Sequence, residues 1–399
     1  MFLIRPMSHK KLNLPIQLEE IFLKRFKSKI QDKDKLLNIY QLKNPELSLT
    51  MAYCNQIFHK FNKGVISYST NIFLPLTSLC RNNCKYCNFR TEFNHNSNFM
   101  KPNQIISLIK SAEVKKCKEA LLTMGEKPEE KYSEVKKHLK KLGNFETTIE
   151  YLIYICKLIL ENSSLLPHSN PGIMNYDELK QLKEVNASLG LMLENISLRL
   201  MDEEGAHEFS PGKHPKKRIK TIENAGKLKI PFTTGILIGI GETDEEIVDS
   251  LLKIEEMNKK FEHIQEIIIQ GFTPLKDKDK KIKSIYNPPS IEKLIKTIII
   301  AKLITDIPIQ TPPNLLTSYQ TYLFCGLDDW GGISPITPDY INPTHPWPTI
   351  GEIRKQTEEL GYILKERLPI YPKFISNDFI PNKLRKRIFK QVNNNGYVK

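Results

Sequence analysis

The chain has 399 residues, of which 40% are hydrophobic and 26% are charged, and its formal net charge is +14. This composition excludes a disordered chain and is sufficient for one large α/β domain or two smaller ones. The excess of Lys and Arg is spread over short runs such as 214–220 and 276–283 without a basic-aromatic stripe, so we predict a solvated lysine-rich surface and no nucleic-acid partner.

The most apolar stretches, YLIYICKLIL (151–160) and KTIIIAKLI (296–304), are short and are interrupted by Lys. A helix that crosses a membrane needs about 20 apolar residues, so no membrane span is predicted. The N-terminal segment lacks the pattern of a signal peptide. Seven cysteines without the spacing of a disulfide framework indicate reduced thiols. We therefore expect a cytoplasmic protein.

Residues 1–68 are predicted to form a helical N-terminal extension. LEEIFLKRFKSKI (18–30) and LTMAYCNQIFHKF (49–61) both place apolar residues at helical spacing. At the other end, residues 311–399 are predicted to form substrate-side loops and closing helices. This part is dense in Pro, Gly and Asp, and a closing helix is expected from about Ile350.

Between these segments, apolar runs alternate with longer amphipathic segments. The runs are 71–77, 119–125, 163–170, 188–196, 231–240 and 264–272, and helices are predicted to begin near Pro102, Phe145, Asn175, Pro215, Thr243 and Ser290. Thr243 with Glu246, and Asn175 with Glu178, have the spacing of a capping box. Six strand-helix units favour a partial or complete parallel (β/α) barrel of the TIM type over residues 69–310, with function at the carboxyl ends of the strands.

Three cysteines follow the first apolar run as Cys80-x3-Cys84-x2-Cys87, and the aromatic residue Tyr86 precedes the third. Thiolates are ligands for zinc or for iron-sulfur clusters. A closed zinc site takes a fourth ligand, and although His95 follows, no paired ligand accompanies it. Three cysteines on a four-iron cluster leave one iron open for a substrate or cofactor. The pattern therefore favours a cluster over zinc.

This Cys-x3-Cys-x-aromatic-Cys pattern resembles the radical S-adenosylmethionine superfamily. The resemblance implies a [4Fe-4S] cluster with three cysteine ligands and one open iron that chelates S-adenosylmethionine. It also implies an external one-electron reductant and cleavage of the cofactor to methionine and a 5'-deoxyadenosyl radical. Cys54, Cys117 and Cys156 are predicted to be buried small hydrophobes, whereas Cys325 is open to either burial or a place in a pocket.

The resemblance also assigns residues at later strand ends to the cofactor. Gly125 and Glu126 match the Gly-Glu element that holds the methionine amino group, and a carboxylate is a sound acceptor for an ammonium. Glu194 follows the fourth run, where burial without a partner would be costly, so we expect it to face the cofactor or Arg199. Gly239 is expected to approach the adenine.

The GIGET turn around Gly239 lacks a complete G-x-G-x-x-G, so it is weak evidence for a dinucleotide fold. In the resemblance, Ile238, Ile240 and Gly241 lie along the adenine with it. His207 and Lys213 are available for anionic or hydroxyl-rich groups, although a surface loop accounts for them equally.

Substrate-side residues are predicted from position alone. His168 and Asn170 end the third apolar run and are the candidates for a catalytic role. Asp328, Asp329 and Trp330 are candidates for substrate contact in the C-terminal region.

Six stretches together resemble the 7,8-didemethyl-8-hydroxy-5-deazariboflavin synthase family over about residues 70–350. They are FLPLTSLCRNNCKYCNFR, LLTMGEKPEE, LPHSNPGIM, HEFSPGKHPKKR, GILIGIGET and QGFTPL. HSNPG and SPGKHPKKR favour the smaller, second-acting subunit, and the long lysine-rich N-terminal extension departs from the family pattern.

The resemblance implies a small-molecule substrate, the adduct that a tyrosine-using partner subunit makes from tyrosine and 5-amino-6-ribitylaminouracil. Ring closure with loss of ammonia would then give the deazaflavin. Three alternatives stay open from the sequence. The chain could be the tyrosine-using subunit, a menaquinone-pathway radical enzyme, or a non-catalytic iron-sulfur or zinc-binding protein.

Overall fold

The computed structural model describes residues 20–399 apart from 23, 26–27, 62, 95–98 and 275–285. Three features of the sequence analysis fall on residues outside these ranges. They are His95, the basic run at 276–283 and part of the predicted helix 18–30. Among the helices in these ranges, none has the length and apolar character needed to cross a membrane.

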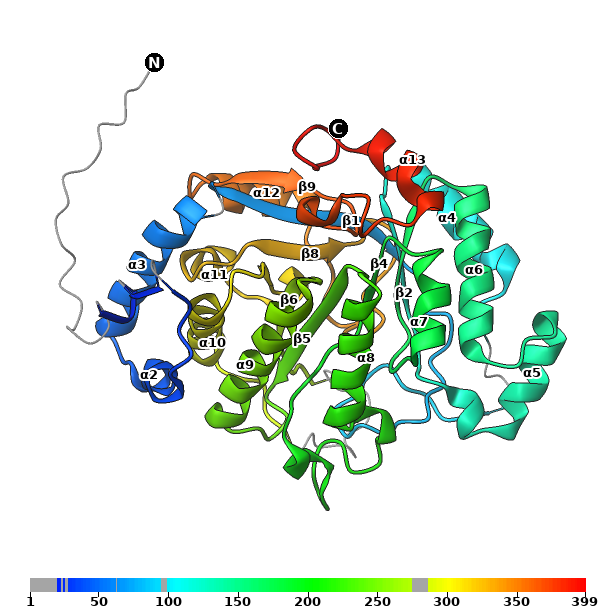
Figure 1. Ribbon diagram of the computed structural model, residues 1–399, viewed down its shortest axis with the longest axis horizontal. Helices are drawn as coiled ribbons and strands as arrows, with labels where there is room; N and C mark the ends of the chain where they lie inside the picture. The colour runs from blue at the N-terminus through cyan, green and yellow to red at the C-terminus, as the bar shows by residue number, and fades with distance from the viewer. Residues whose placement is uncertain (1–19, 23, 26–27, 62, 95–98, 275–285) are drawn as a thin grey trace.

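A closed barrel of eight parallel strands forms the centre of the molecule, with helices outside it (Figure 1). The strands are β1 (Val65–Phe73), β2 (Glu119–Thr123), β3 (Leu166–Asn170), β4 (Ser188–Gly190), β5 (Phe232–Ile238), β6 (Ile264–Gly271), β7 (Ile309–Gln310) and β8 (Asp329–Ile333). They follow chain order around the barrel, which closes because β1 pairs with both β2 and β8. The barrel is therefore complete.

The helices are α2 (Lys33–Leu37), α3 (Glu46–Phe61), α4 (Pro102–Val114), α5 (Ser133–Gly143), α6 (Thr148–Asn162), α7 (Tyr176–Lys183), α8 (Pro215–Lys227), α9 (Asp244–Phe261), α10 (Ile291–Ile304), α11 (Tyr319–Phe324), α12 (Ile350–Glu358) and α13 (Asn382–Gln391). Most helices occupy the connections between strands, whereas α2 and α3 precede β1 and α13 is the last element of the chain. Both capping boxes are confirmed, because Thr243 and Asn175 accept from the backbone N–H groups of Glu246 and Glu178. Sequence alone thus located the starts of α7 and α9.

The barrel extends beyond the predicted boundary at residue 310. β7 has two residues, and β8 has the sequence DWGGI, whose Asp and paired glycines are rare in strands. The region predicted to hold substrate-side loops and closing helices therefore supplies the last strand of the barrel, β8. The fourth predicted run is shorter than expected, because its regular pairing ends at Gly190 and the chain bridges β5 again only at Glu194.

The N-terminal helices share the main hydrophobic core instead of standing apart. Ile30, Leu36, Ile39 and Phe58 are buried in the same cluster as the barrel helices. The backbone N–H of Ile30 donates to the Leu303 carbonyl at 3.0 Å. Figure 1 shows α2 and α3 on the flank beside α10 and α11.

The last part of the chain covers the amino end of the barrel. Strand β9 (Ile363–Glu366) pairs with the start of β1. A second cluster, which includes Leu368, Phe374 and Ile388, packs on Leu166 and Ala187 at the start of the third and fourth strands. The predicted C-terminal region therefore divides, and its final segment lies away from the carboxyl ends of the strands.

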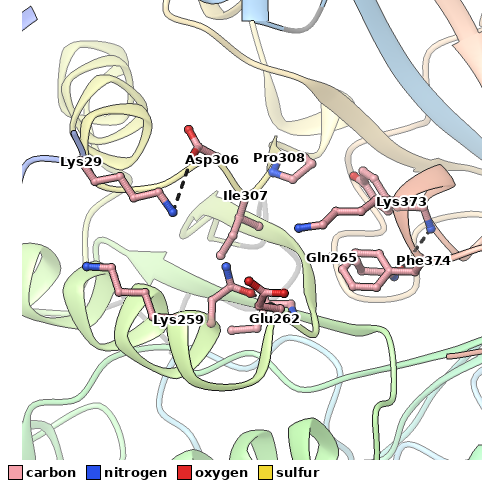
Figure 2. Close-up of a pocket in the computed structure, with 12 residues that line it drawn as sticks. Lys29, Lys259, Glu262, Gln265, Asp306, Ile307, Pro308, Lys373 and Phe374 are labelled. Atoms are coloured by element: carbon pink, nitrogen blue, oxygen red, sulfur yellow. Dashed lines mark hydrogen bonds and ion pairs between the residues drawn. The ribbon is translucent and has the colours of Figure 1, made fainter. Parts of the chain in front are cut away.

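A cavity of about 350 Å³ opens at this amino end, beside the first residues of β6 and the segment that precedes β7 (Figure 2). Its charged lining includes Lys29, whose ammonium lies 3.5 Å from a carboxylate oxygen of Asp306. In parallel barrels this end contributes to stability and the opposite end carries the chemistry.

Candidate active site at the mouth of the barrel

A cavity of about 380 Å³ runs through the barrel from the loop after β1 to a floor beneath the strands. Every strand of the closed barrel contributes to it, through Asn71, Phe73, Glu119, Leu121, Thr123, His168, Asn170, Gly190, Thr233, Leu237, Glu266, Ile268, Gln270, Gln310, Gly331 and Gly332. Arg367 and Pro369, from the C-terminal segment, line its floor. The lumen is therefore closed below and open at the carboxyl ends of the strands.

The three motif cysteines line the mouth of this cavity. Cys84 is buried, Cys80 is half-buried and Cys87 is exposed. The backbone N–H of Glu126 donates to Cys80 Sγ at 3.2 Å, and the Ser210 hydroxyl donates to Cys84 Sγ at the same distance. Hydrogen bonds to sulfur are a regular part of iron-sulfur sites, where they stabilise the thiolate.

Burial raises the pKa of the Cys84 thiol to about 11, while the nearby charge of Lys213 acts in the opposite direction. A bound metal keeps such a thiol deprotonated. In the ranges that the structure describes, no three His, Cys, Asp or Glu side chains are grouped for a single metal ion. A four-iron cluster does not need three side chains around one ion, because each of its cysteine ligands binds a different iron. The thiols and their donors fit a cluster at this mouth.

Glu126, which follows β2, contacts both the cysteine loop and the loop after β3. Its carboxylate accepts from Arg81 at 2.6 and 2.9 Å and from the Ile173 N–H at 3.0 Å. Burial opposes ionisation, but the charges of Arg218 and Arg81 hold the pKa of Glu126 below its ordinary value. A cofactor ammonium at this position would share the carboxylate with Arg81.

Glycine is required at several points of this mouth. A Cβ at Gly125 would lie 1.9 Å from the Leu79 carbonyl oxygen, and one at Gly212 would lie 1.8 Å from the Glu126 carboxylate. No side chain fits within these distances. The predicted Gly125 position is thus fixed by close backbone packing beside the cysteines.

Glu194 pairs with Lys213 and not with the predicted Arg199. Burial opposes its ionisation, but Lys213 holds the pKa of Glu194 below its ordinary value. Arg199 lies outside the cavity lining, has 52% of its side chain exposed and pairs with Glu246 at 2.7 Å. The predicted contact with Arg199 is therefore wrong, because Glu246 holds that guanidinium. Glu194 lines the cavity, and its contact with the cofactor stays a prediction.

Tyr86 lines the cavity, and the Lys213 ammonium lies 5.7 Å from its ring centre. Its hydroxyl is hydrogen-bonded to His207 Nε2 at 3.0 Å. Burial lowers the pKa of His207 to about 3, so this imidazole is neutral. Cys84, Tyr86, Glu194 and Lys213 thus meet at the mouth, whereas His207 supports Tyr86 from behind.

Gly239 does not line the cavity. Its φ is +96°, and its N–H donates to Glu242 at 2.8 Å. Ile238, Ile240 and Gly241 are likewise absent from the lining, and this side of the cavity is formed by Leu237 and Phe272. The residues predicted to lie along the adenine are therefore outside the cavity lining.

His168 and Asn170 both line the lumen, as expected for the end of β3. Ser188 donates its hydroxyl proton to the Pro369 carbonyl at 2.6 Å, so it accepts from His168 Nδ1 at 2.6 Å. Burial lowers the pKa of His168 to about 4. His168 is therefore neutral, with its proton on Nδ1 and a lone pair on Nε2.

The three candidates from the C-terminal region lie outside the lining. Asp328 pairs with Lys302 at 2.8 Å, and Asp329 pairs with Arg367 at 2.6 Å beneath the floor. Trp330 is buried and donates its indole N–H to Thr357 at 3.1 Å. Their expected contact with substrate is wrong, because β8 presents its two glycines to the lumen and not these side chains.

Sequence reasoning missed the polar groups inside the barrel. Asn71, Glu119, Glu266, Gln310 and Arg367 are all buried and all line the cavity. A signal was present, since Asn71, Glu119 and Glu266 lie within apolar strand runs, where a polar residue needs a partner or a ligand. Gln310 and Arg367 lie in segments that carried no strand prediction. Cys54, Cys117, Cys156 and Cys325 are buried and outside the lining.

A model of the radical SAM superfamily matches residues 74–254. The 7,8-didemethyl-8-hydroxy-5-deazariboflavin synthase of Methanocaldococcus jannaschii is 52% identical over 337 residues, which are 84% of this chain and 92% of that protein. The synthase of Methanobrevibacter smithii is 48% identical over 331 residues, 82% of this chain and 96% of that protein.

Two solved structures share the fold at low identity. The [FeFe]-hydrogenase maturase HydG from Carboxydothermus hydrogenoformans has a TM-score of 0.68 at 17% identity and covers 88% of this chain and 79% of its own. Methylornithine synthase PylB has a TM-score of 0.64 at 17% identity and covers 86% and 97%. These structures bear on the architecture alone.

The superfamily match includes the cysteine loop, and the match to the synthases extends over nearly their whole length. A chain with this likeness and these three thiols uses the cofactors of the superfamily, a [4Fe-4S] cluster and S-adenosylmethionine. It therefore belongs to the 7,8-didemethyl-8-hydroxy-5-deazariboflavin synthase family of radical SAM enzymes.

Proposed function

We propose that the chain is the smaller, second-acting kind of synthase subunit. Its substrate is 5-amino-5-(4-hydroxybenzyl)-6-(D-ribitylimino)-5,6-dihydrouracil, and its product is 7,8-didemethyl-8-hydroxy-5-deazariboflavin. For the reaction to balance, the substrate would lose ammonia together with one hydrogen atom, one electron and one proton; the cofactor would take the hydrogen atom, the cluster the electron and the departing ammonia the proton. The ribityl-bearing nitrogen bonds to the phenol ring. This makes the chain a carbon-nitrogen (ammonia) lyase.

The observation that supports this proposal is that the thiols and the polar lumen belong to one cavity. A substrate held in the lumen would face a cofactor held at the mouth. The cofactor supplies the 5'-deoxyadenosyl radical. Cys80, Cys84 and Cys87 hold the cluster, with Ser210 and the Glu126 N–H donating to two of the sulfurs. The closed floor excludes water from below.

At the mouth, Tyr86, Glu194 and Lys213 are proposed to surround S-adenosylmethionine, together with Gly125 and Glu126. Deeper in the lumen, the His168 Nε2 lone pair is proposed to accept a hydrogen bond from a substrate hydroxyl or N–H, with Asn170 beside it. A tyrosine-using subunit supplies the substrate, and an external donor supplies single electrons.

Anaerobic turnover of the reconstituted, reduced protein with S-adenosylmethionine and the adduct tests this function. We expect 5'-deoxyadenosine and deazaflavin fluorescence to appear together and to be lost in Cys84→Ala. The buried thiol of α3 gives the control, Cys54→Ala, which keeps both. Deoxyadenosine without deazaflavin would refute the substrate. Consumption of tyrosine with 5-amino-6-ribitylaminouracil would assign the tyrosine-using step instead.

A further inference from the structure

Two carboxamides in the barrel lumen have polar atoms without a hydrogen-bond partner among the described residues. The side chains of Asn71 on β1 and Gln310 on β7 line the cavity, and the residues are only 1% and 4% exposed. Neither Nδ2 nor Oδ1 of Asn71 has a hydrogen-bond partner, and Oε1 of Gln310 has none. Buried amides are nearly always satisfied, so groups left open in a cavity indicate a ligand.

The glycines of β8 leave room for these amides. β8 lies between β7 and β1 in the barrel. A Cβ at Gly331 would lie 2.1 Å from Gln310 Nε2, and a Cβ at Gly332 would lie 2.1 Å from Asn71 Nδ2. These glycines are consecutive, so each amide contacts one of two neighbouring residues of the same strand. Any larger residue would displace them.

The buried charged groups of the lumen already have partners. Glu119 accepts from Ser69 at 2.7 Å, Glu266 accepts from Thr233 at 2.7 Å, and Arg367 donates to Asp329 at 2.8 Å. His168 Nε2 and the Trp347 indole N–H are also open, but each is a single acceptor or donor. The two carboxamides on the β7–β8–β1 side are the groups that combine a donor with an acceptor.

A carboxamide offers an N–H donor and a C=O acceptor side by side. The complementary ligand group is a ring edge with an adjacent N–H and C=O, as in a pyrimidine-dione. We infer that Asn71 and Gln310, in the space left by Gly331 and Gly332, recognise the pyrimidine edge of the substrate. This inference rests on the proposed function, because the proposed substrate carries a dihydrouracil ring.

The arrangement makes a prediction about specificity. A site built to hydrogen-bond a ring edge rejects an analogue without that edge, since its own buried groups are then left unpaired. Asn71 and Gln310 thus select the pyrimidine and hold it at the β7–β8–β1 wall, while the rest of the molecule extends toward the mouth.

The first test compares binding and turnover of the adduct by the reconstituted enzyme with S-adenosylmethionine present. Asn71→Leu and Gln310→Met are expected to raise both Kd and KM for the adduct by at least about tenfold. Unchanged Kd and KM in both variants would overturn the inference.

Gly332→Ala tests the same site with both amides retained, since the added methyl displaces Asn71. It should reproduce the rise in KM. Gly351→Ala is the matched control, because a Cβ there meets only Thr349 Oγ1 at 3.9 Å. Asn71→Asp keeps the shape of the side chain if the leucine variant does not fold, and its loss of the N–H donor should also raise Kd.

An adduct methylated at the pyrimidine N–H identifies the recognised group. Wild type should bind it at least about tenfold more weakly than the parent, and one of the two amide variants should no longer distinguish the two compounds. If the variants instead lose sensitivity to shortening of the ribityl chain, the amides bind the polyol and the inference is wrong. If wild type neither binds nor converts the adduct, the proposed function itself fails.

Discussion

Buried ionisable side chains determine the charge inside the barrel. Arg367 donates to Asp329 at 2.8 Å and to Glu266 at 3.2 Å, and Glu119 lies in the same lumen. Desolvation raises the pKa of Glu119 to about 7, and the pKa of Glu266 is raised by the same cause. The carboxyl groups of Asp329, Glu266 and Glu119 thus lie around the single guanidinium of Arg367. A proton on Glu119 lowers the net negative charge of this group.

Glu119 gives the barrel a pH-dependent stability. Its folded pKa of about 7 exceeds the ordinary value of 4.5. The folded state therefore holds the proton more tightly, and the stability that this contributes is complete below pH 4.5 and is lost as pH rises to about 7. From this shift we expect Glu119→Gln, measured by urea unfolding, to gain about 3 kcal/mol over wild type between pH 4.5 and pH 8.

Glu161→Gln, at an exposed position of α6, is the control for this measurement and should follow the wild-type profile. Parallel pH profiles for wild type and Glu119→Gln would show that the Glu119 carboxyl is not held protonated by the lumen. Ser69 keeps a partner in the glutamine variant, so the comparison isolates the charge.

Elements at the two ends of the barrel have different tasks. At the carboxyl end, loops from several strands meet around Glu126 and the cysteines. At the amino end, α13 and the segment before it close the floor, and Arg387 donates to main-chain carbonyls of Leu160 and Ser163 at the end of α6. A cation at the carboxyl terminus of a helix is favourable. The Arg387 guanidinium therefore stabilises the packing of α13 against the end of α6.

Neighbouring residues of α13 test this closure. Ile388 is fully buried in the cluster beneath the floor, whereas Phe389 is 46% exposed. Ile388→Ala should lower the free energy of unfolding by about 2–5 kcal/mol, because it leaves a cavity. Phe389→Ala should change it by about 0.5 kcal/mol or less. Urea unfolding of both variants gives the comparison, and equal losses would contradict a packed floor.

At the scale of the whole molecule, strand pairing and one shared hydrophobic core hold the barrel together. Its eight strands close through main-chain pairing, and one hydrophobic core joins the outer helices to the N-terminal ones. The cysteine loop contributes few residues to that core. The cluster is therefore expected to order the mouth and not to determine the fold.

Removal of the cluster tests this expectation. The cluster-free protein should keep the circular dichroism of the barrel and a cooperative unfolding transition. Trypsin should cut after Lys85 and Arg90 at least about tenfold faster than in the holoenzyme, because local opening is no longer opposed by metal binding. Cleavage after Lys373, at the opposite end, serves as the internal reference. Loss of cooperative unfolding would show that the cluster holds the fold together.

Much of the molecule could be predicted because its signals are local. Apolar runs indicated the first six strands, and capping residues located α7 and α9. The first strand was located only in part, because β1 begins at Val65, inside the segment predicted to be helical. The spacing of Cys80, Cys84 and Cys87 identified the superfamily. Each of these signals depends on residues a few positions apart, whose geometry follows from strand or helix periodicity.

The remaining features depend on contacts between distant segments. β8 is a strand because β7 and β1 pair with it on either side, although Gly331 and Gly332 disfavour a strand by themselves. Lys213 pairs with Glu194 because the loop before α8 folds over the mouth, which no spacing in the sequence indicates.

The sequence by itself therefore determined the class of chemistry and the alternation of strands and helices, since ligand spacing and periodicity are properties of short segments. Only the tertiary structure decided which side chains enter the lumen. Asn71 and Gln310 lie far apart in the chain, and closure of the barrel brings them to adjacent glycines of one strand. Pairing between strands that are distant in the chain brings the two side chains to β8, and no local sequence pattern encodes this contact.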